Sequence, residues 1–485
     1  MSATHGIPTA PGAAPAKSSR RHGFGTLLAV DLWERFGFYG MAAVLILYLT
    51  AGGEDGGLGM APPTATAVFA AYMSLAFMAG LPGGWLTDRV LGMRRAILLG
   101  GALIIAGYTV VAVPSEWTLL GGLALVVAGT GLVKPALAAL VAEVGGEGAR
   151  RREAAFSLFY VCIQVSALIA PAVIGAAAEK VAWPLGFVCA SLGMAAGAVQ
   201  FALALGKFGE IGARPQHPIS RPELARVARR AGLLVLTPAA VLIGAVSSGL
   251  VGLPAVLAVL GLATLALPFV YLRRLGRASG GKLRLRGFVV LMLASSVFWM
   301  LFSQSGSVLG IFAERHTDRA VFGFETPASW FQSLHPLFVL LAAPLLARLW
   351  QISGDRVNVS MKFSGALVVA STGFLLMSVA ASSAETGPVV PLWLVAVYAL
   401  YSCGEIALAP AGLALAAAAA PAGYVGRFLA VNGLFGAVGV VAGGQLFRLT
   451  KIMSLSHYFL LLGAFVMGVG ILVGAFSGRL QRLLT

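Results

Sequence analysis

Runs of about 20 apolar residues recur along the whole chain, and no other feature constrains the fold as strongly. A run of that length crosses the hydrocarbon core of a bilayer as a single helix, because a helix satisfies its own backbone hydrogen bonds in lipid. We therefore predict fourteen membrane-spanning helices in the 485 residues. The predicted spans begin near Thr26, Thr64, Arg95, Trp117, Ala154, Trp183, Leu233, Pro254, Gly287, Thr326, Met361, Val389, Tyr424 and Ser456.

The composition excludes a soluble protein. Charged residues make up 11% of the chain and hydrophobic residues 59%, whereas a soluble domain has about 25% charged residues. A net charge of +16 would suit a nucleic-acid partner, but the basic residues lie on the loops between the predicted spans, where they act as topology signals. We expect an all-α polytopic membrane protein that contacts the lipid bilayer and no nucleic acid.

The basic residues are divided unequally between the two sides of the membrane. Of the 34 Lys and Arg residues, 27 lie in the tails and loops on the side of the N-terminus, and 5 lie in the opposite loops. Cytoplasmic loops hold the excess of basic residues, so we expect both termini in the cytoplasm and a multi-pass protein of the bacterial inner membrane. The first apolar run is too long for a cleaved signal peptide.

The predicted spans group as six, two and six. Two six-helix halves are typical of transporters built from repeats, in which the solute site lies between the halves near the bilayer midplane. We predict a disordered cytoplasmic tail (1–25), an N-terminal six-helix bundle (26–206), a cytoplasmic linker (207–231), two accessory transmembrane helices (232–272), a basic cytoplasmic linker (273–286), a C-terminal six-helix bundle (287–479) and a cytoplasmic tail (480–485).

Five charged residues lie deep inside predicted spans: Asp31, Glu34, Arg35, Lys134 and Glu405. Each costs about 2.5–3.5 kcal/mol to insert at the centre of a span, so we expect them to face a wet interior and to pair. Asp31, Glu34 and Arg35 share one helix face, and Arg35 can pair with Asp31 one turn back. Three acids and two bases leave one uncompensated negative charge, and a buried carboxylate of this kind tends to take up a proton.

Two interpretations of these charges remain open. In the first, they form a structural ion cluster that holds the helices together. In the second, they form a solute and proton site, in which Arg35 and Lys134 bind a carboxylate and Glu405 binds an ammonium group. Short peptides and other zwitterions carry both groups, and protonation among the five residues would couple a proton to transport.

The sequence shows no candidate catalytic or metal site. The three cysteines, Cys162, Cys189 and Cys403, lie in apolar spans without the spacing of metal ligands, and the six histidines form no cluster. No nucleophile–base pair is apparent either. We therefore expect a protein that is not an enzyme, with no catalytic residues, no metal and no cofactor besides coupling protons.

Several stretches, in order along nearly the whole chain, resemble the proton-dependent oligopeptide transporters of the major facilitator superfamily. "DLWERFGFYGM" resembles the ExxERFxYYG signature of that family. "GGWLTDRVLGMRRAI" resembles the loop after the second span, and "GTGLVKPALAALV" the fourth span, which carries a lysine. "AAFSLFYVCIQVSALIAP", "SVFWMLFSQSGS" and "YSCGEIALAPAGLAL" are similar to the fifth, seventh and tenth spans.

This resemblance implies a major facilitator fold with two accessory helices, and import of di- and tripeptides driven by protons through a rocking of the two bundles. It places the proton-coupling residues at Asp31, Glu34, Arg35, Lys134 and Glu405. It places the substrate-binding residues at Arg35, Tyr39, Tyr72, Lys134, Gln164, Trp299, His335 and Glu405. Asp88 and Arg89 fall on the gating loop.

The chain also departs from the family pattern. Ala42 and Ser303 stand where the family has an arginine and a glutamate that pair, and losing both avoids an orphan buried charge. His335 stands where the family has a pocket asparagine, either as a satisfied core residue or as a side chain that meets solute or proton. The remaining departures are Asp31 for glutamate, Phe38 for tyrosine, Gln164 for asparagine and Asn432 for tryptophan.

These departures keep two alternatives open. The same fold could carry a different zwitterionic or peptide-like solute, by import or by export. The chain could also be a receptor that transports nothing, although Arg35, Lys134 and Glu405 are intact. We expect a monomer in either case.

Overall fold

The computed structural model describes residues 17–144, 149–233, 237, 241, 244–245, 248–278, 286–321, 323–353, 357–421 and 424–484. In this part of the chain, thirteen helices are long and apolar enough to cross a membrane. The run that begins near Leu233 falls mostly outside the described residues, so the count of fourteen stays a prediction. The multi-pass, predominantly helical architecture is confirmed.

The N-terminal bundle consists of six long helices. They are α1 (Lys17–Thr50), α2 (Pro62–Leu86), α3 (Met93–Val111), α4 (Glu116–Val144), α5 (Ala149–Lys180) and α6 (Trp183–Leu203), with a π-helical turn, η1 (Thr87–Leu91), after α2 and a 3₁₀ turn, η2 (Leu205–Phe208), after α6. Helix α1 begins at Lys17, so it extends into the segment 1–25 for which we predicted a disordered tail.

A short helix and an accessory helix follow the first bundle. Helix α7 (Arg221–Ala231) lies in the predicted cytoplasmic linker, and α9 (Leu253–Ala278) is one of the two predicted accessory helices. Helix α9 packs against α2 and α15, which belong to different bundles. The accessory segment therefore covers a junction between the two halves of the protein.

The C-terminal bundle contains the remaining elements. They are α10 (Arg286–Ser305), α11 (Val308–His316), the strands β1 (Ala320–Val321) and β2 (Phe324–Glu325), the 3₁₀ helix η4 (Ala328–Ser333), α12 (Leu334–Ser353), α13 (Val359–Ser383), α14 (Leu392–Ala419), α15 (Val425–Leu446), η6 (Phe447–Lys451), α16 (Leu455–Ala475) and α17 (Ser477–Leu484). The antiparallel hairpin β1–β2 pairs Ala320 with Glu325 and was not predicted from the sequence.

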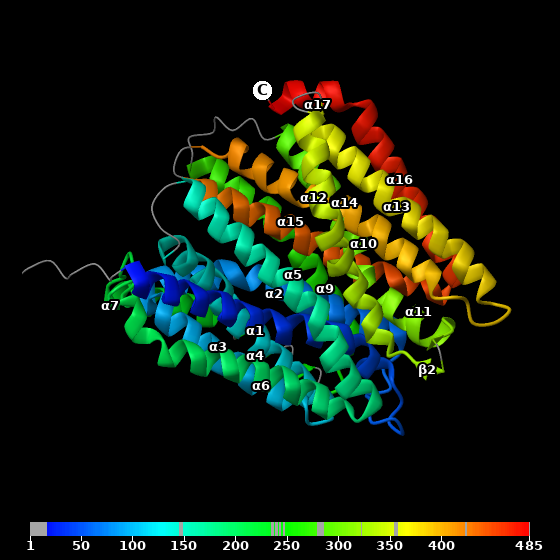
Figure 1. Cartoon of the computed structure of the whole chain (residues 1–485), viewed down its shortest axis with the longest axis horizontal. Coiled ribbons are helices and arrows are strands. Elements are labelled where there is room, and N and C mark those ends of the chain that lie inside the picture. Colours follow the sequence, from blue (N-terminus) through cyan, green and yellow to red (C-terminus); the bar gives the residue numbers. More distant parts are fainter. Residues whose placement is uncertain are drawn as a thin grey trace, which may run out of the picture.

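The two bundles lie side by side, and Figure 1 shows the blue-to-green helices α1–α6 on one side and the yellow-to-red helices α12–α17 on the other. Helices of the two bundles meet where α2 packs on α15 and where α5 packs on η4 and α12. The space between the bundles is therefore bordered by α1, α2, α4 and α5 from one half and by α10, α12, α14 and α15 from the other.

Glycines let neighbouring helices approach closely within a bundle. A Cβ atom at Gly107 of α3 would lie 2.7 Å from the carbonyl oxygen of Gly122 of α4, and a Cβ atom at Gly122 would lie 2.7 Å from the carbonyl oxygen of Gly107. Small residues at a helix interface are the usual means of packing in lipid, where no hydrophobic effect drives helices together.

Candidate functional site

Three charged side chains lie on one face of α1, as their spacing predicted. The Nε atom of Arg35 lies 3.3 Å from Oδ1 of Asp31 and 3.5 Å from Oε2 of Glu34. Asp31 is 1% exposed and Glu34 is 2% exposed. Burial of two carboxylates is costly unless they are paired, and Arg35 supplies that pairing within its own helix.

Lys134 of α4 completes a cluster of four charges with these residues. Its Nζ atom lies 3.9 Å from Oε1 of Glu34 and 3.6 Å from the centroid of the Phe38 ring. The aromatic face attracts the ammonium group electrostatically, so Lys134 has two partners on α1. Two acids and two bases make this α1–α4 charge cluster formally neutral, and Glu405 is the fifth of the deep charges.

Glu405 of α14 lies in the other bundle, beside two titratable side chains. Its Oε2 atom lies 2.6 Å from Nε2 of His335 on α12 and accepts a hydrogen bond of 3.3 Å from the Tyr401 hydroxyl. The imidazole and the Tyr401 ring lie 5.0 Å apart. The sequence singled out His335 as a substituted pocket residue, but it contained no signal that His335 would contact Glu405.

Both charge groups face one cavity between the bundles. We call this the central cavity. Its charged and polar lining comes from both halves of the protein, with Arg35, Tyr39, Lys134 and Gln164 on one side and Trp299, His335 and Glu405 on the other. Cations from the N-terminal bundle and a carboxylate from the C-terminal bundle therefore meet the same space, as the sequence predicted.

A second cavity continues from the first and shares several lining residues with it, among them Tyr39, Phe302 and His335. Ala42 and Ser303, the two positions where the family pattern has a charged pair, both line this second cavity. Most of its other lining is apolar, contributed by Phe69, Met73, Ala167, Pro171 and Val440. Because the residues at positions 42 and 303 are small and uncharged, a mostly apolar space lies beside the central cavity.

The other predicted site residues have different surroundings. Trp299 packs its ring 5.8 Å from Phe77 of the opposite bundle. Tyr72 is buried with its ring 6.1 Å from that of Phe38, and the lining of the two cavities does not include it. Asp88 and Arg89 lie exposed in η1, where their carbonyl oxygens accept backbone hydrogen bonds from His217 and Ile219 of the linker.

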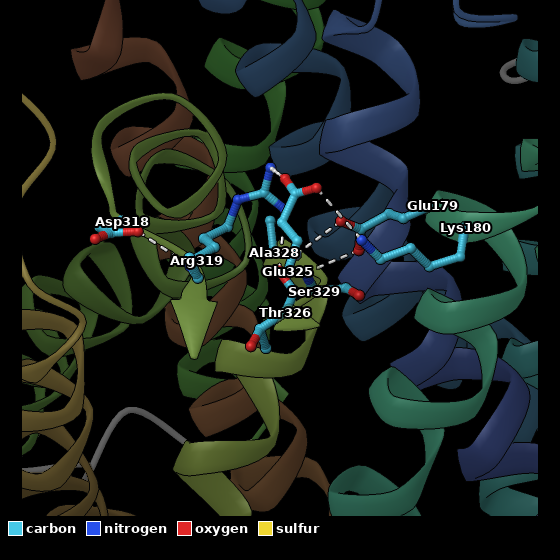
Figure 2. A network of polar contacts seen from close by, with 9 residues as sticks. Glu179, Lys180, Asp318, Arg319, Glu325, Thr326, Ala328 and Ser329 are labelled. Atoms are coloured by element: carbon cyan, nitrogen blue, oxygen red, sulfur yellow. Dashed lines mark hydrogen bonds and ion pairs between the residues drawn. The ribbon is translucent and has the colours of Figure 1, made fainter. Parts of the chain in front are cut away.

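A polar network that the sequence did not predict joins the bundles at the end of α5 (Figure 2). Both oxygens of the Glu179 carboxylate accept hydrogen bonds at the start of η4, from the backbone N–H groups of Ala328 at 2.7 Å and Ser329 at 3.0 Å. Lys180 lies 3.6 Å from Glu325 of the hairpin, which is 2.8 Å from Arg319. The sequence feature that could have indicated this network is the presence of opposite charges at 179–180 and 319–325, on predicted non-cytoplasmic loops.

The same contact continues along α5 toward the cavity. The Trp330 ring nitrogen donates to the carbonyl oxygen of Ala172 at 3.0 Å, and the Ser333 hydroxyl donates to that of Leu168 at 2.7 Å. A Cβ atom at Gly175 would lie 2.9 Å from Cβ of Ser329. We call these interactions of Leu168, Ala172, Gly175 and Glu179 with residues 328–333 the α5–η4 contact. It joins the two bundles at this end of α5.

Comparison with known proteins identifies the family. A model of the POT family matches residues 94–228 and 279–461. The chain is 32% identical over 467 residues to the uncharacterized transporter YclF of Bacillus subtilis (strain 168), covering 95% of this chain and 94% of that one. It is 30% identical over 472 residues to a di-/tripeptide transporter of Lactococcus lactis subsp. cremoris, covering 93% of each chain.

Solved structures agree with this assignment. A crystal structure of the peptide transporter POT in complex with sulfate matches the fold with a TM-score of 0.89 at 32% sequence identity, and the match covers 95% of each chain. A match of this extent includes both six-helix bundles. The chain belongs to the POT family, a family of transporters and not of enzymes.

Proposed function

We propose that this protein imports di- and tripeptides together with protons across the bacterial cell membrane. The observation that supports this proposal is the central cavity, where Arg35 and Lys134 of one bundle and Glu405 of the other line a single space. A peptide carries a carboxylate at one end and an ammonium group at the other. Arg35 and Lys134 bind the carboxylate, and Glu405 binds the ammonium group.

Alternating access supplies the movement in this proposal. A cargo held by both bundles favours one relative arrangement of the halves, and its release favours another. The α5–η4 contact supports this step, because the hydrogen bonds and ion pairs that join the bundles at this end can break and form again. Opening of that end requires these interactions to break, while the opposite end closes.

Protons enter this mechanism through the carboxylates of the deep charges. Glu34 lies between Arg35 and Lys134, so its protonation removes the charge that holds Lys134 to α1. The lysine is then available to the carboxylate of the cargo. Protonation among Asp31, Glu34 and Glu405 thus changes which ion pairs form inside and across the bundles, and no cofactor other than the proton is required.

Uptake by purified protein in proteoliposomes tests the proposal. A labelled dipeptide is supplied outside, a pH gradient is imposed, and Lys134→Ala and Glu405→Gln are compared with the unmodified protein. Both variants should lose most of the pH-driven uptake. The exposed residues Lys451 and Glu385 provide matched controls, Lys451→Ala and Glu385→Gln, which should transport normally. Normal uptake by both cavity variants would refute the mechanism.

The second cavity favours a variant of this function, in which the same fold carries a zwitterion with a large apolar substituent. Phe69, Met73 and Val440 offer an apolar surface to such a group. Competition for dipeptide binding by a panel of peptides and other zwitterions separates the two possibilities. Stronger competition by non-peptide zwitterions than by any dipeptide would favour a different cargo, and binding without flux in either direction would favour a receptor.

A further inference from the structure

His335 contacts the carboxylate of Glu405, the group that binds the amine of the cargo in the proposed function. Its Nε2 atom lies 2.6 Å from Oε2 of Glu405, the shortest of the side-chain contacts described for either residue. Both His335 and Glu405 also line the central cavity. The imidazole of His335 thus does more than fill space in the core, and it is not a free pocket side chain, because it already contacts the carboxylate of Glu405.

The surrounding helices hold the imidazole in this place. The Ser402 hydroxyl donates to the carbonyl oxygen of Tyr398 within α14 at 2.7 Å and also lies 3.2 Å from that of His335, so α12 and α14 approach closely here. The imidazole packs against Tyr401 at 5.0 Å and meets the Phe302 ring edge-on at 6.0 Å. Tyr401 donates to the same Glu405 oxygen, so both of the contacts seen in the described part of the chain converge on Oε2, and Oε1 is the oxygen that we assign to the solute.

An imidazolium group and an ammonium group interact with a carboxylate in the same way. Each is a cation that donates hydrogen bonds to it, and Glu405 carries a single negative charge. A cargo amine that binds Glu405 therefore lowers the affinity of the His335–Glu405 pair for a proton. Conversely, a proton on the pair lowers its affinity for the amine. The proton and the amine thus compete for one negative charge, so binding of the cargo depends on pH.

Other titratable and charged groups around the pair set its environment. Those that face the cavity or lie near Glu405 come from three elements: Arg35 and Tyr39 of α1, Lys134 of α4 and Tyr160 of α5. Tyr398 and Tyr401 belong to α14 itself. The two cations belong to the proposed carboxylate subsite, so Glu405 and His335 are the acid–base pair at the opposite end of the cavity.

We propose that His335 is a specificity-determining residue of the amine subsite, in which the cargo ammonium and a proton on the His335–Glu405 pair exclude one another. This inference rests on the proposed role of Glu405. Binding of an amine-bearing cargo therefore releases a proton from this pair to solvent, and the protons that the proposed function imports with the cargo are those on Asp31 and Glu34. Conversely, a proton that reaches the pair expels the amine end, which makes His335 a trigger for release of the cargo.

Calorimetry of Ala-Ala binding in buffers of different ionisation enthalpy tests the proposal, because it counts the protons released per peptide bound. His335→Asn keeps a hydrogen-bond donor beside Glu405 but does not titrate. As the pH is lowered, the affinity of the unmodified protein for Ala-Ala should fall, by up to about tenfold per pH unit, with up to about one proton released per peptide bound. In His335→Asn this dependence should flatten and the released fraction should fall.

Control variants and ligands separate the possible outcomes. His457→Asn changes a histidine at the start of α16, bonded to Ser454 outside the cavity, and should behave like the unmodified protein. His335→Gln serves as a second variant if His335→Asn is poorly folded. Equal pH slopes and equal proton release with and without His335 would overturn this inference. N-acetyl-Ala-Ala binding as tightly as Ala-Ala would instead refute the amine role of Glu405, and with it the proposed function.

Discussion

The Nζ atom of Lys134 lies 3.6 Å from the centroid of the Phe38 ring, on the wall of the central cavity. The ring therefore holds the lysine from one side while Glu34 holds it from the other at 3.9 Å. Phe38 replaces a tyrosine of the family pattern, and the aromatic face that attracts the cation is retained. The position of Lys134, which we propose to bind the carboxylate of the cargo, thus depends on a neutral residue as well as on charges.

Replacing Phe38 by leucine should weaken peptide binding, because leucine fills similar space without an aromatic face. A cation–π interaction of this kind contributes about 0.5–2 kcal/mol, so the dissociation constant of a dipeptide should rise severalfold. Phe38→Tyr, which keeps the face, should retain more of the affinity. Calorimetric titration of both variants measures the difference, and identical affinities in the leucine and tyrosine variants would contradict the role of the ring.

Ala42→Arg should destabilise the protein strongly, because it places an unpaired charge in the second cavity. An orphan buried charge costs about 3–5 kcal/mol. Ser303 lines the same cavity, so Ala42→Arg combined with Ser303→Glu should recover much of the lost stability. Thermal unfolding in detergent, followed by tryptophan fluorescence, compares the two. A double variant no more stable than Ala42→Arg alone would show that the two positions do not meet.

Ala42→Leu should reduce the binding of bulky cargo selectively. Ala42 is buried and lines the second cavity, so three added carbons occupy the space proposed for a large apolar side chain. Overfilling such a space costs about 1–3 kcal/mol, which corresponds to roughly tenfold weaker binding of Phe-Ala, with Ala-Ala little affected. Ala418→Leu, at an exposed position of α14, is the control. Equal losses for both peptides would argue against a separate apolar subsite.

Glu179→Ala should shift the protein toward arrangements in which the α5–η4 contact is open, because two backbone N–H groups of η4 lose their acceptor. Spin labels at Val181 and Val390, both exposed near this end, report the opening after the native cysteines are replaced by serine. The population of long distances should grow in Glu179→Ala. An unchanged distance distribution would mean that the contact does not hold this end closed.

Gly175→Ala offers an independent version of that test. The added Cβ atom would crowd Ser329, whose own Cβ atom would lie 2.9 Å away, so the variant should show the same opening. Ser329→Gly removes the obstructing side chain and should restore the closed distance in a Gly175→Ala background. If the double variant stays as open as the single one, the opening has a cause other than this close approach.

The sequence predicted those features that the bilayer itself enforces. Apolar length marked the spans, and the cost of charge in lipid required Arg35 to pair with Asp31, which it does. The family motifs then placed Lys134 and Glu405 on opposite bundles facing one cavity. These inferences depend on local pattern and on burial energies, which a sequence contains directly.

Contacts between distant segments were not predictable in the same way. His335 and Glu405 are 70 residues apart, and their contact depends on how α12 turns against α14. The hydrogen bonds from η4 to Glu179 require a 3₁₀ helix whose backbone donors point at α5, and no side-chain pattern at 328–333 indicates that. The early start of α1 at Lys17 was missed because Pro, Ala and Ser near the N-terminus favoured a tail.

The direct test of the central claim is a thermodynamic cycle between the two ends of a dipeptide and the two ends of the cavity. Affinities of Ala-Ala, its N-acetylated form and its C-terminal amide are measured for the unmodified protein, Glu405→Gln and Lys134→Ala. Acetylation should cost far less in Glu405→Gln than in the unmodified protein, and amidation far less in Lys134→Ala. If each modification costs the same in all three proteins, the two bundles do not divide the charges of the cargo between them.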